Sequence, residues 1–369
     1  MGSAALTHPT ALLAACLLAA PAPASADLFE ASQLPAPQGR INHAPGIAEL
    51  PSGDLLACWY SGSTEGAEDA EILCSRSSDA GQNWQAAVVA AAPGERAADA
   101  RNANKSVGNV ALYLDANARL WLINGVIQRW DWPIFGNLCL NWYCGRIDAR
   151  FSLDEGRSWT RPMRLDDRVG ALPRAKPLHD PALGDLVPVY DEDEQNSAVL
   201  VTDLAAARAG EVPPTRLLPI PGEQAIQPSL LRLPDGALRA YLRDQQSDWV
   251  RSSVFNPATQ SWSPVQRTDL PNPDSGLDAF VDAQGEIAVV GNPSDHDRLS
   301  LAVAVGTDGL HFPRRCTLVE PGAQGEAAYP AVLTARDGSV HIVYSAQGKR
   351  EIRHLRFDAA WLEHCLSGR

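Results

Sequence analysis

Short apolar runs, joined in pairs by tight-turn signals, recur along the chain and predict β-hairpins. The first copy runs from Gly46 to Trp59, with a turn at Gly53 between two apolar segments. Apolar strands on either side of such a turn are typical of antiparallel pairing. The turns of the six copies centre on Gly53, Asn117, Gly184, Gly236, Gly285 and Gly338.

The spacing of these turns predicts the architecture. Successive turns lie 49 to 67 residues apart, which leaves room for two further strands in each copy. Four strands make one propeller blade, whereas an isolated hairpin could not bury enough surface. We therefore predict an all-β fold, a single six-bladed β-propeller of four-stranded antiparallel blades over residues 41–365, after a linker at residues 27–40. We expect the last strand, 352–357, to pair with N-terminal residues and close the ring.

Composition supports this class and excludes some partners. The chain has 369 residues, of which 45% are hydrophobic, with 28 Gly and 28 Pro. That many breakers disfavours a helical bundle. Forty-four acidic residues against 31 basic residues give a net charge of −13. This balance argues against binding to nucleic acid or to an anionic membrane.

The N-terminus has the pattern of an export signal. Thr10 to Ala20 is an apolar run too short to span a bilayer, and Ala24-Ser25-Ala26 resembles a cleavage site. We predict a signal peptide over residues 1–26 and a periplasmic or secreted mature chain. The segment ending in Cys16 also fits a lipoprotein cleavage box, which is the alternative. No later segment of the sequence is predicted to span a membrane.

Six cysteines remain in the mature chain, and an even count in an exported protein permits disulfides. Cys139 and Cys144 are close enough for a small loop, and Cys58 and Cys74 lie on successive predicted strands. Buried free thiols are an equal alternative. No C-x-x-C or paired Cys/His spacing occurs, so we expect no metal site in the chain. Nothing in the sequence requires an organic cofactor, and a Ca²⁺ ion on the acidic loops is the alternative. The six are Cys58, Cys74, Cys139, Cys144, Cys316 and Cys365.

A second repeat follows two of the predicted strands. The octets from Ser77 to Trp84 and from Ser152 to Trp159 share the pattern S-x-D-x-G-x-x-W. The aspartate can accept backbone N–H groups across a turn, and the glycine can take positive φ. We therefore expect structural rather than catalytic roles for Asp79 and Asp154.

This octet is the Asp box of sialidases, and the chain resembles the sialidase-like BNR-repeat family from about residue 41 to residue 357. The resemblance implies a six-bladed propeller with a site at the mouth of its central channel. It also implies three arginines that hold a substrate carboxylate, a Tyr–Glu pair that supplies the nucleophile, and an acid/base carboxylate.

Three residues match the motifs of that family. Arg243 closes the segment LRLPDGALRAYLR, and Arg298 opens RLSLAV before a degenerate Asp box. Tyr329 stands in EAAYP before the sixth hairpin. The resemblance implies that Arg243 and Arg298 bind the carboxylate and that Tyr329 is the nucleophile. Because two guanidiniums repel each other, we expect their convergence to require an anionic ligand.

Two positions depart from the family pattern. His43 stands where the first sialidase arginine would, and Gln227 where the glutamate partner of the tyrosine would. His43 could donate a neutral hydrogen bond, or a charged one at low pH. An amide cannot act as a base, so Glu326, three residues before Tyr329, is a candidate for that role. A solvated loop charge is the alternative for Glu326.

Other polar residues near the hairpins are candidates for the site. In the acidic loop 62–69 we prefer Glu65 as the acid/base, with Asp69 second, and a solvated loop is the alternative. Lys176, Asn272 and Asp278 precede the third and fifth hairpins and could contact substrate oxygens.

The function that these features favour is an exported glycoside hydrolase that removes a terminal acidic sugar, sialic acid or a related carboxylated sugar, from glycans. A tyrosine nucleophile avoids placing an anion against the sugar carboxylate. Two alternatives stay open, a non-catalytic carbohydrate-binding propeller and a polysaccharide lyase on the same fold. Fold alone does not separate the three.

Overall fold

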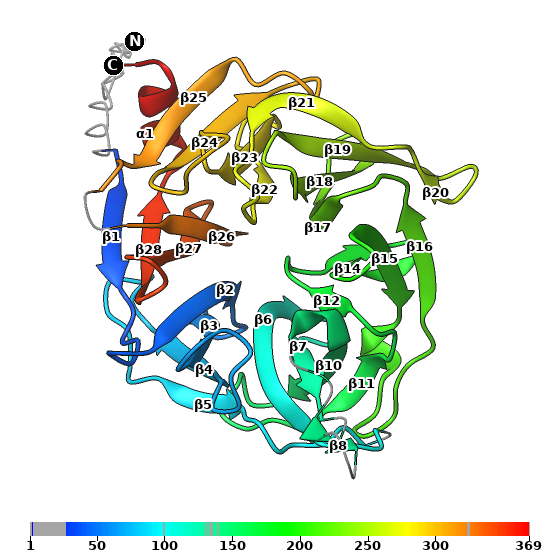
Figure 1. The fold of residues 1–369 in the computed structure, drawn as a ribbon. Coiled ribbons are helices and arrows are strands. Elements are labelled where there is room, and N and C mark those ends of the chain that lie inside the picture. The colour runs from blue at the N-terminus through cyan, green and yellow to red at the C-terminus, as the bar shows by residue number, and fades with distance from the viewer. Residues whose placement is uncertain are drawn as a thin grey trace.

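The strands form a ring of six antiparallel sheets around a common axis (Figure 1). The computed structural model describes residues 2, 27–98, 100–129, 131–132, 136–137, 139, 141–322 and 325–368. The predicted signal peptide, including Cys16, lies outside the described residues except for Gly2. The six-bladed propeller predicted from the hairpin repeat is confirmed.

The first three blades follow each other in the chain. Blade one consists of β2 (Ile41–Glu49), β3 (Leu55–Gly62), β4 (Glu71–Ser77) and β5 (Val88–Ala91). Blade two consists of β6 (Asn104–Leu114), β7 (Leu120–Gln128), β10 (Gly145–Ser152) and β11 (Met163–Asp166). Blade three consists of β12 (Ala171–Pro173), β13 (Leu178–Asp180), β14 (Gly184–Asp191), β15 (Asn196–Thr202) and β16 (Arg216–Ile220).

The last three blades repeat the pattern. Blade four consists of β17 (Ala225–Arg232), β18 (Leu238–Asp244), β19 (Trp249–Asn256), β20 (Ser261–Trp262) and β21 (Gln266–Pro271). Blade five consists of β22 (Asp278–Val281), β23 (Ile287–Gly291), β24 (Leu301–Gly306) and β25 (Arg314–Val319). Blade six consists of β26 (Ala327–Thr334), β27 (Val340–Ala346), β28 (Glu351–Phe357) and β1 (Phe29–Gln33).

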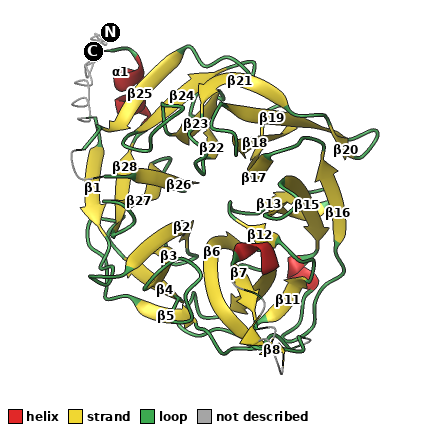
Figure 2. Ribbon diagram, in the orientation of Figure 1, coloured by secondary structure: helices red, strands yellow, loops and turns green. Residues whose placement is uncertain are grey.

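Strands joined by loops and turns make up most of the described chain, and helices are few, as Figure 2 shows. Near the C-terminus a short helix lies beside β25. Among the described residues no helix is long and apolar enough to cross a membrane. The additional elements are β8 (Asp131–Trp132), β9 (Gly136–Asn137), η1 (Trp142–Cys144), η2 (Leu204–Ala206) and α1 (Ala359–Leu366).

The ring closes through the N-terminal strand. β1 pairs with β28, from Phe29 opposite Phe357 to Gln33 opposite Arg353. The two ends of the chain therefore share blade six, and the edge of β28 is covered. This confirms that the last strand pairs with N-terminal residues. The segment expected as a linker, residues 27–40, contributes this strand to the fold.

The Asp boxes act as turns. Ser77 Oγ accepts the Gly81 N–H at 2.8 Å, and Asp79 accepts the backbone N–H of Asn83 at 2.9 Å. Hydrogen bonds from Asn83 and Ser77 lower the pKa of Asp79 to about 2. The second box repeats these contacts, and bonds from Ser158 and Ser152 lower the pKa of Asp154 to about 2. The structural role expected for both aspartates agrees with these contacts.

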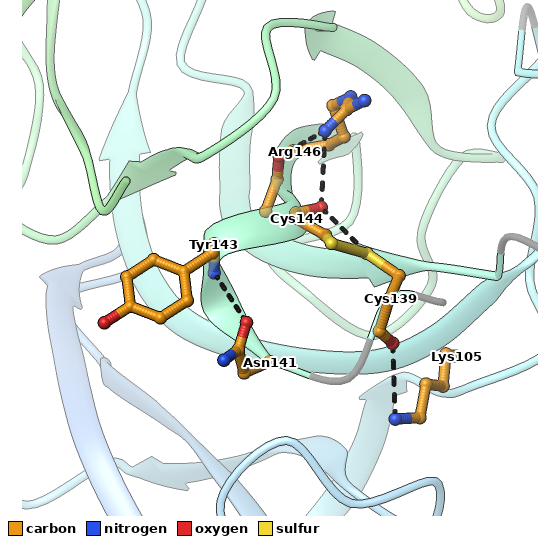
Figure 3. Close-up of a disulfide and its surroundings, with 7 residues drawn as sticks. Lys105, Cys139, Asn141, Tyr143, Cys144 and Arg146 are labelled. Carbon is orange, nitrogen blue, oxygen red and sulfur yellow. Dashed lines mark hydrogen bonds between the residues drawn. A yellow bond between two sulfur atoms is a disulfide. The ribbon is translucent and has the colours of Figure 1, made fainter. Parts of the chain in front are cut away.

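Three disulfides lie within the described residues. Cys58–Cys74 joins directly opposite residues of β3 and β4, as the sequence allowed. Cys139–Cys144 closes a small loop before β10, shown in Figure 3. Cys316–Cys365 ties β25 to α1. The alternative of buried free thiols does not hold for these six cysteines.

Candidate active site

Four inner strands carry a bulge with one non-glycine residue in left-handed backbone. These residues are Ala44 on β2, Asn109 on β6, Gln227 on β17 and Tyr329 on β26, with φ from 36° to 56°. In β2, β17 and β26 a proline follows, and its missing N–H interrupts the ladder. Such backbone costs about 1–3 kcal/mol and clusters at functional sites. The shared bulges therefore indicate a candidate site where these inner strands lie near the central axis of the propeller.

Tyr329 lies at the centre of this site. Three guanidinium groups surround its ring, with Arg174 at 5.1 Å and Arg243 and Arg298 each at 5.8 Å from the ring centre. Arg243 Nη1 also donates a hydrogen bond to the Tyr329 hydroxyl oxygen at 2.5 Å. A charged donor at a phenol oxygen stabilises negative charge on that oxygen. The arrangement is suited to a tyrosine that acts as a nucleophile.

Arg243 and Arg298 converge as expected, but a protein carboxylate links them. Arg243 Nε and Nη2 lie 2.7 and 2.6 Å from Asp274 Oδ1. Arg298 Nη2 lies 3.9 Å from Asp274 Oδ2 and also donates to the Asp274 backbone carbonyl. The expectation that convergence alone would require an external anion is therefore wrong, because Asp274 supplies the negative charge.

Arg243 is held in its charged form. Burial opposes the charge, but Tyr329 and Asp274 outweigh it and raise the pKa of Arg243 above its ordinary value. Its side chain is only 11% exposed. A buried, charged guanidinium with a carboxylate on one edge and a phenol on the other is fixed in orientation.

Arg174 completes the set of three arginines and was missed in the sequence. It is 2% exposed, and its Nη2 and Nη1 donate to the carbonyls of Pro330 at 2.9 Å and Pro45 at 3.4 Å. It therefore ties the bulge of β26 to that of β2. It stands two residues before Lys176, which sequence reasoning chose instead.

His43 packs on Tyr329, with ring centres 4.3 Å apart, and its Nδ1 lies 2.8 Å from Ser345 Oγ. Burial lowers the pKa of His43 well below 6.5, and the positive charges of Lys349 and Arg174 lower it further. The site therefore holds a neutral imidazole. Of the two roles considered for His43, the neutral hydrogen-bonding one fits this environment.

Gln227 contacts a second tyrosine rather than Tyr329. Its Nε2 donates to the Tyr190 hydroxyl at 3.3 Å, and Asn109 Nδ2 donates to the same oxygen at 2.9 Å. The Gln227 Oε1 atom is buried without a hydrogen-bond partner among the described residues. Beside Tyr190, burial raises the pKa of Glu192. Sequence reasoning missed Tyr190, near the end of β14, and Glu192, directly after this second strand of the third hairpin.

Glu65 and Asp69 lie in one loop but in different surroundings. Tyr60, on β3, donates its hydroxyl to Glu65 Oε1 at 2.9 Å, and Lys349 Nζ lies 3.3 Å from Glu65 Oε2. Asp69 instead accepts the Ser63 N–H at 3.0 Å, which is the main cause that lowers its pKa. A general acid needs a proton at the working pH, which the lowered pKa of Asp69 disfavours, so Glu65 stays the preferred candidate.

The three arginines around Tyr329 form a clamp, which consists of Arg174, Arg243 and Arg298. Glu326 pairs with this clamp rather than with the tyrosine. Its Oε1 lies 3.4 Å from Arg298 Nη1. Among the described residues, the hydrogen bond to the Tyr329 hydroxyl comes from Arg243 and not from a carboxylate. The contacts of Glu326 therefore match a counter-ion of Arg298.

The other predicted contact residues are engaged with the protein. Lys176 Nζ lies 2.8 Å from Asp278 Oδ2, and Asp278 also accepts the Val332 N–H at 2.7 Å and the Ser229 hydroxyl at 2.5 Å. Asn272 bonds the backbone N–H and carbonyl of Ser275 and so shapes the loop that carries Asp274. Both Asn272 and Asp278 are buried, so they hold neighbouring protein groups in place rather than face the solvent.

No group of three His, Cys, Asp or Glu side chains that could hold a metal ion occurs in the described part of the chain.

Comparison with solved structures finds the same fold at low identity. The NanB sialidase from Streptococcus pneumoniae matches with a TM-score of 0.69 and 12% identity over 88% of this chain and 69% of that one. A protein of unknown function from Dyadobacter fermentans gives 0.71 and 12% over 89% and 98%. An alpha-L-arabinanase from Penicillium chrysogenum gives 0.58 and 15% over 90% and 99%. At these identities the likeness shows the fold alone.

Comparison of sequences identifies the family. No curated protein matches the chain. Residues 53–342, which include most of the propeller and the residues Arg174, Arg243, Asp274 and Tyr329, match the model of the BNR repeat-like domain. The chain belongs to the family of BNR repeat-like domains.

Proposed function

We propose that this protein is an exported glycoside hydrolase of the sialidase type that releases a terminal acidic sugar from glycans. The observation that carries the proposal is the Tyr329 hydroxyl, which is bonded to Arg243 and surrounded by three guanidiniums. A sialidase and an arabinanase with the same fold add support, because both are named as enzymes that act on sugars.

In the first step, the Tyr329 oxygen attacks, and Arg243, which donates to that oxygen, stabilises the negative charge it carries once its proton has left. The Tyr329 oxygen forms a bond to the anomeric carbon while the bond from that carbon to the leaving-group oxygen breaks. Glu65, held by Tyr60, gives its proton to the leaving oxygen. The phenol proton passes to solvent water before the attack, because the Gln227 amide cannot accept it.

In the second step, water replaces the tyrosine. The Glu65 carboxylate takes a proton from water, the water oxygen bonds to the anomeric carbon, and the bond to Tyr329 breaks to return the phenolate. Two displacements at one carbon retain its configuration. Arg298, whose side chain is 24% exposed, is the part of the clamp that an incoming sugar carboxylate can reach first.

A hydrolysis screen tests the proposal. The purified chain is incubated with fluorogenic glycosides of sialic acid, other ulosonic acids and uronic acids, with neutral glycosides as controls. We expect release of fluorophore from an acidic glycoside with retained configuration at the anomeric carbon. Hydrolysis of neutral glycosides alone would contradict the acidic-sugar assignment.

A non-catalytic carbohydrate-binding propeller is the second candidate. Gln227 favours it, because an amide stands where the family resemblance implies a glutamate, and the described contacts of the Tyr329 hydroxyl include no carboxylate. Binding of acidic glycans without turnover of any glycoside in the screen would support this candidate instead.

The disulfides support the export part of the proposal. Three disulfides form within the described residues, and such bonds persist in oxidising compartments such as the periplasm or the exterior. Recovery of the mature chain from the periplasm or medium, with cleavage after Ala26, would test it.

A further inference from the structure

We propose that Asp274 is a specificity-determining residue that competes with the substrate: its carboxylate occupies the Nε–Nη2 edge of Arg243, and a carboxylated sugar binds this edge only by displacing it. The inference rests on the proposed function, because it concerns how the same site selects acidic sugars. Nothing in the family motifs matched in the sequence assigns a role to this position.

Asp274 occupies the Nε–Nη2 edge of Arg243. Its Nε and Nη2 face Asp274 Oδ1 at 2.7 and 2.6 Å, and its Nη1 bonds the Tyr329 hydroxyl. Bidentate binding of a carboxylate needs two parallel N–H groups of one guanidinium. At the Nε–Nη2 edge those groups are the ones that Asp274 uses, so a sugar carboxylate and Asp274 exclude each other there.

The loop that carries Asp274 is fixed, so the exchange can occur at the side chain. Asn272 closes the turn through the backbone of Ser275, at 3.1 and 2.9 Å, and Arg298 donates to the carbonyl of Asp274. Asp274 itself has a left-handed backbone, with φ of 52°. Its side chain is 33% exposed, so it can rotate toward solvent while the loop stays in place.

The neighbouring pair of Arg298 and Glu326 offers an internal comparison. Glu326 also places a carboxylate at the clamp, but it contacts Arg298 at 3.4 Å, and in the described part of the chain it forms no hydrogen bond or ion pair with Arg243. Removing its charge changes the electrostatics of the clamp without freeing the edge of Arg243. If Asp274 competes with the substrate, removing its charge should raise the affinity for a carboxylated sugar more than removing the charge of Glu326. If the effect is only electrostatic, both changes should raise the affinity equally.

The test measures binding by calorimetry to sialic acid and to a uronic acid, each beside its methyl ester. In Asp274→Asn we expect the Kd for the acids to fall about tenfold, because the competing charge is gone while an oxygen acceptor remains. The Kd for the esters should stay within about twofold. Glu326→Gln, with the same charge change, should strengthen binding of the acids by less than about threefold.

Each outcome decides the inference. The inference is overturned if the Kd for the acids in Asp274→Asn is unchanged or higher, or if the affinity for acids and esters rises equally. It is also overturned if Glu326→Gln raises the affinity for the acids as much as Asp274→Asn does, or if no variant binds the acids. If Asp274→Asn does not fold, Asp274→Ser is measured against the same criteria. If Asp274→Asn binds the acids more tightly but no glycoside is turned over, the proposed hydrolysis is refuted and the competition by Asp274 stands. If glycosides are turned over but Asp274→Asn binds the acids as wild type does, the competition is refuted and the hydrolysis stands.

Discussion

Arg243 donates a hydrogen bond to the hydroxyl oxygen of Tyr329 at 2.5 Å, from a different blade of the propeller. The family resemblance implies a glutamate as the partner of this tyrosine, whereas the amide Gln227 stands at that position and the hydroxyl bonds the cation Arg243. The difference changes the chemistry, because a guanidinium stabilises the phenolate but cannot accept its proton.

Replacing the tyrosine tests its role as nucleophile. Tyr329→Phe removes the attacking oxygen but keeps the ring among the guanidiniums, so we expect hydrolysis to fall by at least about 10³-fold while affinity changes little. Tyr344→Phe, a buried tyrosine on β27 in the same blade, is the matched control and should keep most of the activity. Steady-state kinetics and calorimetry separate the two effects, and normal hydrolysis by Tyr329→Phe would exclude this nucleophile.

Arg298 should contribute mainly to substrate binding. Arg298→Ala removes a charged donor from the clamp, and a hydrogen bond to a charged group contributes about 1.5–3 kcal/mol, so affinity for an acidic sugar should weaken about 10- to 100-fold. Arg350→Ala, an exposed arginine outside the cluster, should leave affinity unchanged. Equal affinities for Arg298→Ala and wild type, measured by calorimetry, would remove Arg298 from the clamp.

Acid should destabilise blade six, where the two ends of the chain close the ring. Burial lowers the pKa of His341 to about 4 and that of His354 to about 3, and the two rings are bonded at 2.9 Å in blade six. Below about pH 6.5 the unfolded chain binds protons that the folded chain excludes, so the free energy of unfolding falls, by up to about 1.4 kcal/mol per pH unit for each histidine.

Unfolding in urea between pH 7 and pH 4 measures this slope. His354→Gln should reduce it, because one buried imidazole is removed. His179→Gln, an exposed histidine, should leave it as in wild type. A slope that is the same in His354→Gln as in wild type would show that these buried histidines do not govern acid stability.

The disulfides should differ in their contribution to stability. Cys316–Cys365 closes 49 residues and Cys139–Cys144 closes 5. On the chain-entropy account, replacing the first pair by serine costs about 4 kcal/mol of unfolding free energy and replacing the second about 2 kcal/mol. Urea unfolding of the two double variants gives the order, and a larger loss from the 139–144 pair would contradict it.

The blades could be predicted because their signals are local. Turn glycines such as Gly236 and Gly338 take positive φ between apolar strands, and the sequence marks both features. The bulges could not, because left-handed backbone at Gln227 and Tyr329 has no residue-type signature beyond the proline that follows. Tertiary packing in the ring sets those conformations.

The candidate site could be predicted only in part. Arg243, Arg298 and Tyr329 lie together, as their equivalent blade positions implied. Asp274 and Arg174 were missed, because their partners are on other blades and no spacing in the sequence records such pairs. Asp278, which was predicted to contact substrate oxygens, instead binds Lys176 and the backbone N–H of Val332.

The central claim is that Tyr329 forms a covalent bond to an acidic sugar, and trapping that bond tests it most directly. The protein is incubated with an acidic glycosyl fluoride that carries a second fluorine beside the anomeric carbon, which slows the hydrolysis of a glycosyl intermediate, and is then digested and mapped by mass spectrometry. The account predicts one added sugar on the peptide that contains Tyr329. Turnover of the corresponding glycoside with no adduct on Tyr329, or with the adduct on another residue, would contradict it.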